Sequence, residues 1–295
     1  MIRLGTAPDS WGVWFADDPA QTPWPRFLDE VVRAGYEWIV LGPYGYLPTD
    51  PARLRDELAA RGLRASGQAV FADLHHGPAA WDRVLADALA VAALVRAVGA
   101  GHLVYLPTLH RTEDGTGGRL EPAELTPAQW ADLTTGVTRL GRVLASEHGV
   151  RLAFHPHADT HVGTQAEVER FLADTDPEWV SLCLDTGHIS YYGGDNLELV
   201  RRYPDRIGYV HLKQVDPAVT RKVAAEDLSL AEAVRLGVMV EPPAGVPDLG
   251  PVVAALAGLG TDLFAIVEQD LYPCAFDVPL PIAARTREHL RGYGL

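Results

Sequence analysis

The sequence contains little cysteine and no apolar run of membrane length. Only two cysteines, Cys183 and Cys274, occur among 295 residues, which excludes a disulfide framework and predicts two reduced thiols. No uninterrupted apolar segment approaches the roughly 20 residues that a membrane helix requires. The opening residues, MIRLGTAPDSW, lack a charged region followed by an apolar one. No secretory signal is therefore visible, and we expect a cytoplasmic protein.

Positive charge is also scarce. The chain has 25 basic residues against 39 acidic ones, and its net charge is −14. Nucleic acids and anionic membrane surfaces both need a basic footprint, so neither is expected as the main partner. Hydrophobic residues make up 47% and charged residues 22%, which is typical of a globular protein with a full core. A small-molecule partner is expected instead, and assembly into a homo-oligomer stays open.

Short apolar or β-branched runs recur along the whole chain. They occupy residues 2–7, 36–41, 63–70, 102–106, 151–155, 180–185, 207–212 and 263–268. Each run is too short for a helix and lacks the polar alternation of a half-exposed strand. Buried parallel strands are therefore predicted.

Helical patterns separate these runs. They cover residues 24–36, 50–63, 79–100, 126–150, 164–174 and 281–293. The first begins near Pro23 and Pro25 and ends at Gly35, as helices typically do. Strict alternation of strand and helix favours a single (β/α)8 TIM barrel over residues 1–295.

An open doubly wound sheet is the rival fold. Such a sheet usually has a glycine-rich first turn, and the turn GTAPDSWG contains no G-x-G-x-x-G pattern. No Gly/Ser-rich linker divides the chain. Two long segments, 107–125 and 213–250, are expected as insertions on the catalytic face of the barrel, where they could cover a pocket.

Four predicted strands end in groups that can bind metal or carry protons. His155 and His157 follow the fifth run, Asp185 ends the sixth, His211 lies in the seventh and Glu268 ends the eighth. Each alone has an ordinary structural explanation, such as a helix cap or a hydrogen-bonded core histidine. Because strand ends of a barrel meet at one mouth, together they predict a site for one divalent ion of the Mn, Co, Zn or Mg kind.

The motifs around these residues resemble those of a known family. LCLDTGH, YVHLK and IVEQD are similar to segments of the sugar isomerase/epimerase superfamily of xylose-isomerase-like TIM barrels. GTAPDSWGVW, GPYGYLPTDPARLRDEL and HPHADTHV resemble more narrowly its inosose dehydratase-like branch. The resemblance implies one divalent metal ion, with Asp185, His211 and Glu268 at the last three ligand positions. His155 stands at the first, where the superfamily usually has glutamate.

The resemblance implies a metal-dependent lyase of inositol catabolism that dehydrates a keto-cyclitol such as 2-keto-myo-inositol. A metal-dependent sugar isomerase or epimerase acting on a ketose is the nearest alternative. The epimerases exchange a proton between two glutamates, and His155 removes that pair without excluding proton transfer by imidazole. A non-catalytic sugar-binding protein is a further alternative. An apurinic endonuclease shares the barrel, but it needs a basic DNA groove, which a chain of net charge −14 argues against.

Several residues are candidates for the chemistry and for substrate contact. The candidate acids and bases are His157, His188, Lys213 and Glu268. Lys213 follows His211 by two residues, so it should point into the same mouth. Expected substrate contacts are Trp11, Tyr44, Gln68, His188 and Lys213, because an indole suits the apolar face of a cyclitol ring.

The remaining candidates are assigned by position alone. Asp9 and Tyr46 follow the first and second predicted strands and could reach the pocket. His75 and His76 follow the third, where an exposed loop is the simplest expectation. His161 is expected near the start of the next helix and without a metal.

Overall fold

Eight parallel strands close into a barrel, which confirms the predicted fold class and excludes the open sheet. A computed structural model describes residues 1–295. The barrel strands are β1 (Ile2–Thr6), β2 (Trp38–Val40), β3 (Arg64–Ala72), β4 (His102–Pro107), β5 (Arg151–Phe154), β6 (Val180–Asp185), β7 (Ile207–Leu212) and β10 (Leu263–Val267). Neighbours in sequence are neighbours in the sheet, and β1 closes it by pairing with both β2 and β10. Every strand therefore ends at the same face.

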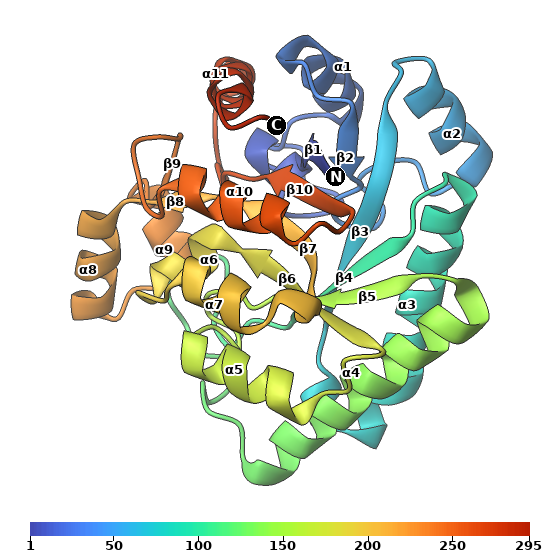
Figure 1. Ribbon diagram of the computed structural model, residues 1–295, viewed down its shortest axis with the longest axis vertical. Helices are drawn as coiled ribbons and strands as arrows, with labels where there is room; N and C mark the ends of the chain where they lie inside the picture. The colour runs from blue at the N-terminus through green and yellow to red at the C-terminus, as the bar shows by residue number, and fades with distance from the viewer.

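Helices surround the strands (Figure 1). They are α1 (Trp24–Ala34), α2 (Pro51–Ala59), α3 (Pro78–Ala97), α4 (Pro127–His148), α5 (Gln165–Asp174), α6 (Thr186–Tyr191), α7 (Asn196–Arg202), α8 (Pro217–Glu226), α9 (Leu230–Arg235), α10 (Leu249–Gly258) and α11 (Pro279–Arg291). The helices begin and end at the predicted capping residues. Thr126 and Gln129 form a capping box at the start of α4, and Gly35 ends α1 in the left-handed region. None of these helices is both long and apolar enough to cross a bilayer. The first and last helices, α1 and α11, pack beside each other.

The interior of the barrel is filled by side chains. A small apolar cluster inside the strands consists of Ala7, Val40, Val104, Leu106, Ala153, Cys183, Tyr209 and Ile266. The Tyr209 hydroxyl lies 2.7 Å from the Ser66 hydroxyl, which joins β7 to β3 on the opposite side of the barrel. The larger core lies between the strands and the helices. Any ligand site must therefore lie above this interior plug, at the carboxyl ends of the strands.

Two long connections lie at this mouth. The chain after β7 forms a small antiparallel pair, β8 (Gln214–Val215) with β9 (Met239–Val240), together with α8 and α9. Figure 1 shows α8 at the outer edge of the molecule. Arg111, in the connection after β4, forms an ion pair with Asp227 and donates to its carbonyl oxygen at 2.8 Å. The two connections therefore contact each other over the barrel mouth.

Candidate metal centre

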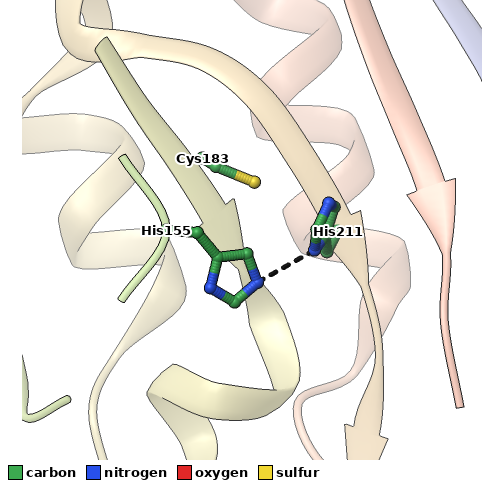
Figure 2. Close-up of side chains that lie close together, drawn as sticks. All are labelled: His155, Cys183 and His211. Carbon is green, nitrogen blue, oxygen red and sulfur yellow. Dashed lines mark hydrogen bonds between the residues drawn. The ribbon is translucent and has the colours of Figure 1, made fainter. Parts of the chain in front are cut away.

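Four side chains from four strand ends converge at the mouth of the barrel. We call His155, Asp185, His211 and Glu268 the floor cluster; all four are buried. His155 Nε2 lies 2.9 Å from His211 Nδ1 and 3.3 Å from Asp185 Oδ2, and His211 Nδ1 lies 2.9 Å from Glu268 Oε2. Figure 2 shows the two imidazoles facing each other. The structure thus brings together the four residues whose strand ends suggested a metal.

The donor atoms of the floor cluster suit a divalent ion. One Asp185 oxygen accepts the backbone N–H groups of Gly187 and His188, each at 2.8 Å, and so caps α6. Its other oxygen is buried and accepts no hydrogen bond. Two ring nitrogens and two carboxylate oxygens so close together match the mixed N/O ligand sets of Zn, Mn or Co. A free, buried oxygen aimed at these atoms fits a bound cation.

Charge balance at the mouth also favours a cation. Four carboxylates, from Asp9, Asp185, Glu268 and Asp270, surround the single ammonium group of Lys213. Burying unpaired carboxylates costs several kcal/mol each unless a counter-charge is present. Burial, followed by repulsion from Glu268, raises the pKa of Asp9 well above its ordinary value. A divalent ion would offset part of this negative charge.

Lys213 is fixed by contacts on three sides. Its Nζ lies 3.2 Å from Glu268 Oε2, 3.2 Å from Asp270 and 3.3 Å from His188 Nε2. Burial would lower the pKa of Lys213, but the carboxylates of Asp185, Asp270 and Glu268 raise it well above its ordinary value overall. The ammonium is therefore charged at neutral pH. Gly187 makes room for it, because a Cβ there would lie 2.6 Å from Lys213 Cγ.

His157 and His188 take different places. His157 lines the pocket, and its Nδ1 donates to the Ala158 carbonyl at 2.8 Å, which leaves a lone pair on Nε2. Burial, with His155 and Lys213 nearby, lowers the pKa of His157 to about 3, so its ring is neutral at neutral pH. His188 is fully buried and does not line the pocket. His188 therefore lies behind Lys213 on α6, outside the pocket lining.

Cys183 lies close to the same two imidazoles (Figure 2). It precedes Asp185 by two residues on β6, so its side chain points into the barrel one layer lower. Burial raises the pKa of the Cys183 thiol. A protonated thiol is a poor metal ligand, and the Asp185 and Glu268 carboxylates are better donors at neutral pH.

The floor cluster opens into a pocket. His155, His211 and Glu268 line its floor together with Lys213. The wall residues include Asp9, Val13, Trp14, Gly42, Pro43, Ala69, Phe71, Leu109, Thr112, Glu113, His157, Asp159, Leu230, Ala231 and Asp270. Both long connections therefore contribute residues to the pocket.

Trp11 is not among the pocket residues, which corrects its expected contact with substrate. The 3₁₀ turn Pro8–Trp11 directs its indole into the core, where Nε1 donates to Glu30 at 2.9 Å. The ring packs edge-on against Phe27 with centroids 5.1 Å apart. Trp14 lines the pocket instead and stacks on Tyr272 at 5.0 Å.

Tyr44 and Gln68 also lie outside the pocket lining. Tyr44 is 44% exposed, because the turn after β2 places Gly42 and Pro43 at the pocket and carries Tyr44 outward. Gln68 is buried, and its amide donates to the Gly42 carbonyl at 3.2 Å. Successive side chains of a strand alternate, and Ala69, next to Gln68, lines the pocket.

The sequence interpretation missed Asp270 and Trp14. Asp270 follows Glu268 by two residues, a spacing that could have placed both on one side of the chain. Asp9 and Tyr46, which were assigned by their position after a strand, lie in different environments. Asp9 lines the pocket, whereas Tyr46 is buried and donates to the Thr22 carbonyl at 2.9 Å.

The expectation of an exposed histidine pair was wrong for one of its members. The side chain of His75 is fully buried, whereas that of His76 is 48% exposed. Both contact Glu121, and so does His161, which is also buried. The three histidines come from two loops that lie far apart in the sequence, so local reasoning could not bring them together.

Comparison with known proteins agrees with the fold. The model of the family described as "Xylose isomerase-like TIM barrel" matches residues 28–292. An inosose dehydratase of Geobacillus thermodenitrificans is 30% identical, with 98% of this chain and 96% of the relative covered. Among solved structures, a probable 3-DHS dehydratase, AsbF, of Bacillus anthracis has a TM-score of 0.72 at 15% identity over 99% of both chains.

A further solved structure is described as the IolI protein with a bound zinc atom. It has a TM-score of 0.70 at 14% identity, with 98% of this chain and 96% of that chain covered. Structural likeness at these identities shows the fold alone, whereas the family match extends over most of the chain. From its barrel, its floor cluster and this match, the chain belongs to the xylose isomerase-like TIM barrel family.

Proposed function

We propose that this protein is a metal-dependent lyase that removes water from a keto-cyclitol, such as 2-keto-myo-inositol, in inositol catabolism in the cytoplasm. The observation that carries the proposal is the floor cluster, which lies at the base of a pocket with a neutral imidazole and an ammonium beside it. The similarity to inosose dehydratases over 98% of the chain supports the substrate class.

One divalent ion of the Mn, Co, Zn or Mg kind would be held by His155, Asp185, His211 and Glu268. When bound, such an ion polarises a ketone and its neighbouring hydroxyl and so acidifies the C–H between them. The protein supplies the proton transfers. His157 Nε2 carries a lone pair and lines the pocket, so it can accept the proton from carbon.

Lys213 would supply the acid. Its ammonium is held at the pocket floor by Glu268 and Asp270. It can give a proton to the departing β-hydroxyl, which leaves as water while the C–H electron pair forms the new double bond. The resulting enol then rearranges to a trihydroxycyclohexane dione. His188, 3.3 Å from Lys213 Nζ, would position the ammonium without touching the substrate.

The nature of the first ligand favours dehydration over epimerisation. An epimerase of the glutamate-pair type needs carboxylates on opposite faces of the substrate, and here Glu268 lies 2.9 Å from His211 in a cluster whose first member is His155. Only one glutamate of the pair is present. A sugar isomerase or epimerase is therefore the alternative that the assay must separate.

The test is a direct assay with the metal-loaded protein. Purified protein with Mn²⁺ or Co²⁺ is incubated with 2-keto-myo-inositol, and the ultraviolet absorbance of the dione product is followed. A parallel reaction offers a free ketose and separates epimers by chromatography. Rising absorbance without epimerisation supports the lyase. Epimerisation without absorbance change would replace it with an epimerase, and substrate binding without either product would indicate a sugar-binding protein.

A further inference from the structure

A second histidine–carboxylate cluster lies beside the pocket but outside its lining. We call His75, His76, His161 and Glu121 the loop cluster. His75 and His76 lie in the 3₁₀ turn Leu74–His76 after β3, Glu121 in the connection after β4 and His161 in the loop after β5. None of the four lines the pocket. The proposed lyase chemistry therefore makes no use of them.

Three imidazole nitrogens point at one carboxylate. His75 Nε2 lies 3.2 Å from both oxygens of Glu121. His76 Nε2 lies 3.3 Å from Oε2, and His161 Nε2 lies 3.1 Å from Oε1. The donor atoms of His75, His76 and Glu121 all lie within 4.8 Å of one another. The arrangement has the convergence of a ligand set.

The hydrogen bonds of two of these rings leave lone pairs facing the carboxylate. His161 Nδ1 lies 2.9 Å from the Ala123 carbonyl oxygen, which can only accept, so the ring proton is on Nδ1. In the neutral ring, Nε2 then presents a lone pair to Glu121. His76 has carboxylates at both nitrogens, Asp73 at Nδ1 and Glu121 at Nε2, each at 3.3 Å. The neutral ring has one N–H for these two carboxylates, and either a second proton or a bound cation satisfies the other contact.

The outer contacts resemble those of metal-binding histidines. Such a histidine typically donates its second ring N–H to a carbonyl or carboxylate, which fixes the ring and its tautomer. Ala123 plays that part for His161, and Asp73 for His76. Asp73 is itself held by an ion pair with Arg83. Two of the three rings are thus oriented with Nε2 toward Glu121.

Burial completes the site on three sides. The side chains of His75 and His161 are fully buried, and that of Glu121 is 20% exposed. His75 Nδ1 has no hydrogen-bond partner. His76 is the most exposed of the four, at 48%, which gives an ion a way in.

We propose that the loop cluster binds a second divalent transition-metal ion, of the zinc kind, through Nε2 of His75 and His76 and the carboxylate of Glu121, the three groups whose donor atoms lie within 4.8 Å of one another. They supply three of the four ligands that zinc prefers. His161 lies beside the carboxylate, with Nε2 3.1 Å from Oε1. The cluster lies outside the pocket lining, so the ion would be structural. It would connect the turn after β3 to the connection after β4, which also carries the pocket residues Thr112 and Glu113.

The test counts metal ions in the folded protein. Purified protein is loaded with Zn²⁺ or Co²⁺, passed through a desalting column and measured by mass spectrometry for metal per chain. We expect two ions in the wild type, one in Glu121→Gln, one in Asp185→Asn and none in the double variant. His148→Gln, at the end of α4 and remote from both clusters, should keep two. His76→Gln tests the same site through an exposed side chain if Glu121→Gln folds poorly.

The spectrum of the bound ion gives an independent measurement. In Asp185→Asn loaded with Co²⁺, we expect intense visible bands of a tetrahedral site, and these should disappear when Glu121→Gln is added. One ion per chain in the wild type, lost entirely in Asp185→Asn and unchanged in Glu121→Gln or His76→Gln, would overturn the proposal. Metal content does not depend on turnover, so failure of the lyase assay would leave this result intact.

Discussion

The floor cluster and the loop cluster combine the same side-chain types at different places in the fold. The floor ligands lie at the ends of β5, β6, β7 and β10, whose backbones are paired on both sides. The loop ligands lie on connections outside the barrel strands. Pocket residues surround the first cluster, whereas a backbone carbonyl and outer carboxylates surround the second. An ion with an open side suits chemistry, and an ion enclosed by protein ligands suits structure.

Each cluster depends on different neighbouring groups. The floor cluster needs a charged neighbour that can reach the substrate, and Lys213 provides it at 3.2 Å from Glu268. The loop cluster needs rings fixed from behind, which Ala123 and Asp73 provide. Breaking each set of contacts should therefore change different observables.

Removing one floor ligand should have the largest effect. Asp185→Asn keeps an oxygen that can cap α6 but loses the negative charge that faces the imidazoles. We expect turnover of the keto-cyclitol to fall by at least about 10³-fold, because loss of the ion removes the polarisation of the ketone. Steady-state kinetics together with circular dichroism check this. Near-normal turnover in a folded variant would remove the floor cluster from catalysis.

Replacing the acid should have the next largest effect. In Lys213→Gln we expect kcat to fall by about 10²–10⁴-fold, the usual contribution of a proton-transferring group. The metal content should stay unchanged, which distinguishes this variant from Asp185→Asn. Gly187→Ala is a second variant that tests the same residue, because the new Cβ would lie 2.6–2.9 Å from carbon atoms of the Lys213 side chain and displace it. An unchanged kcat in both variants would assign the acid to another residue.

Removal of the loop ion should reduce stability more than rate. With excess Zn²⁺, we expect Glu121→Gln to lower the Tm by several degrees, since an ion at 1,000 times its Kd stabilises a fold by about 4 kcal/mol. The kcat should change by less than about threefold. Calorimetry with and without Zn²⁺ measures the difference. A Tm that responds to Zn²⁺ equally in Glu121→Gln and wild type would contradict a structural ion at this place.

Substitutions of the two tryptophans near β1 should have smaller effects, and these should differ because Trp14 lines the pocket and Trp11 lies in the core. Trp14→Ala should raise KM by about tenfold, because the ring that lines the pocket is lost. Trp11→Phe should leave KM unchanged and lower the free energy of unfolding by about 1–3 kcal/mol, since its hydrogen bond to Glu30 is buried. If the two outcomes were exchanged, the assignment of the pocket wall would be wrong.

A histidine outside both clusters should affect stability only in acid and leave it nearly unchanged at neutral pH. His102 begins β4, and burial lowers its pKa from 6.5 to about 4. The unfolded chain therefore binds more protons in this range, and stability is lost as the pH falls from about 6.5 to 4, by at most about 1.4 kcal/mol per pH unit. Denaturant unfolding of His102→Gln should show a shallower slope than the wild type. Equal slopes would mean that His102 titrates normally in the folded protein.

The sequence predicted the barrel and the floor cluster for the same physical reason. Buried parallel strands are visible as apolar runs, and the residue that ends a run is carried to a known face of the sheet. His155, Asp185, His211 and Glu268 each lie at or next to the end of such a run, so their meeting could be predicted.

Residues beyond the strand ends could not be placed in this way. The 3₁₀ turn after β1 decides that Trp11 points inward while Trp14 lines the pocket. His75 and His161 lie 46 and 40 positions from Glu121, and only the path of three loops brings them together. Loop paths depend on tertiary contacts, such as the ion pair of Arg111 with Asp227, that no local pattern encodes.

The side chains that fill the barrel interior leave the pocket open at one end only. Tyr209 and Ser66 close the lumen beneath the floor cluster, so reactant, released water and product must all pass through the carboxyl end of the barrel. In a site of this kind, product has no second exit through which to leave while reactant enters. Product that lingers therefore blocks the next reactant, and inhibition by the dione should be competitive with the keto-cyclitol.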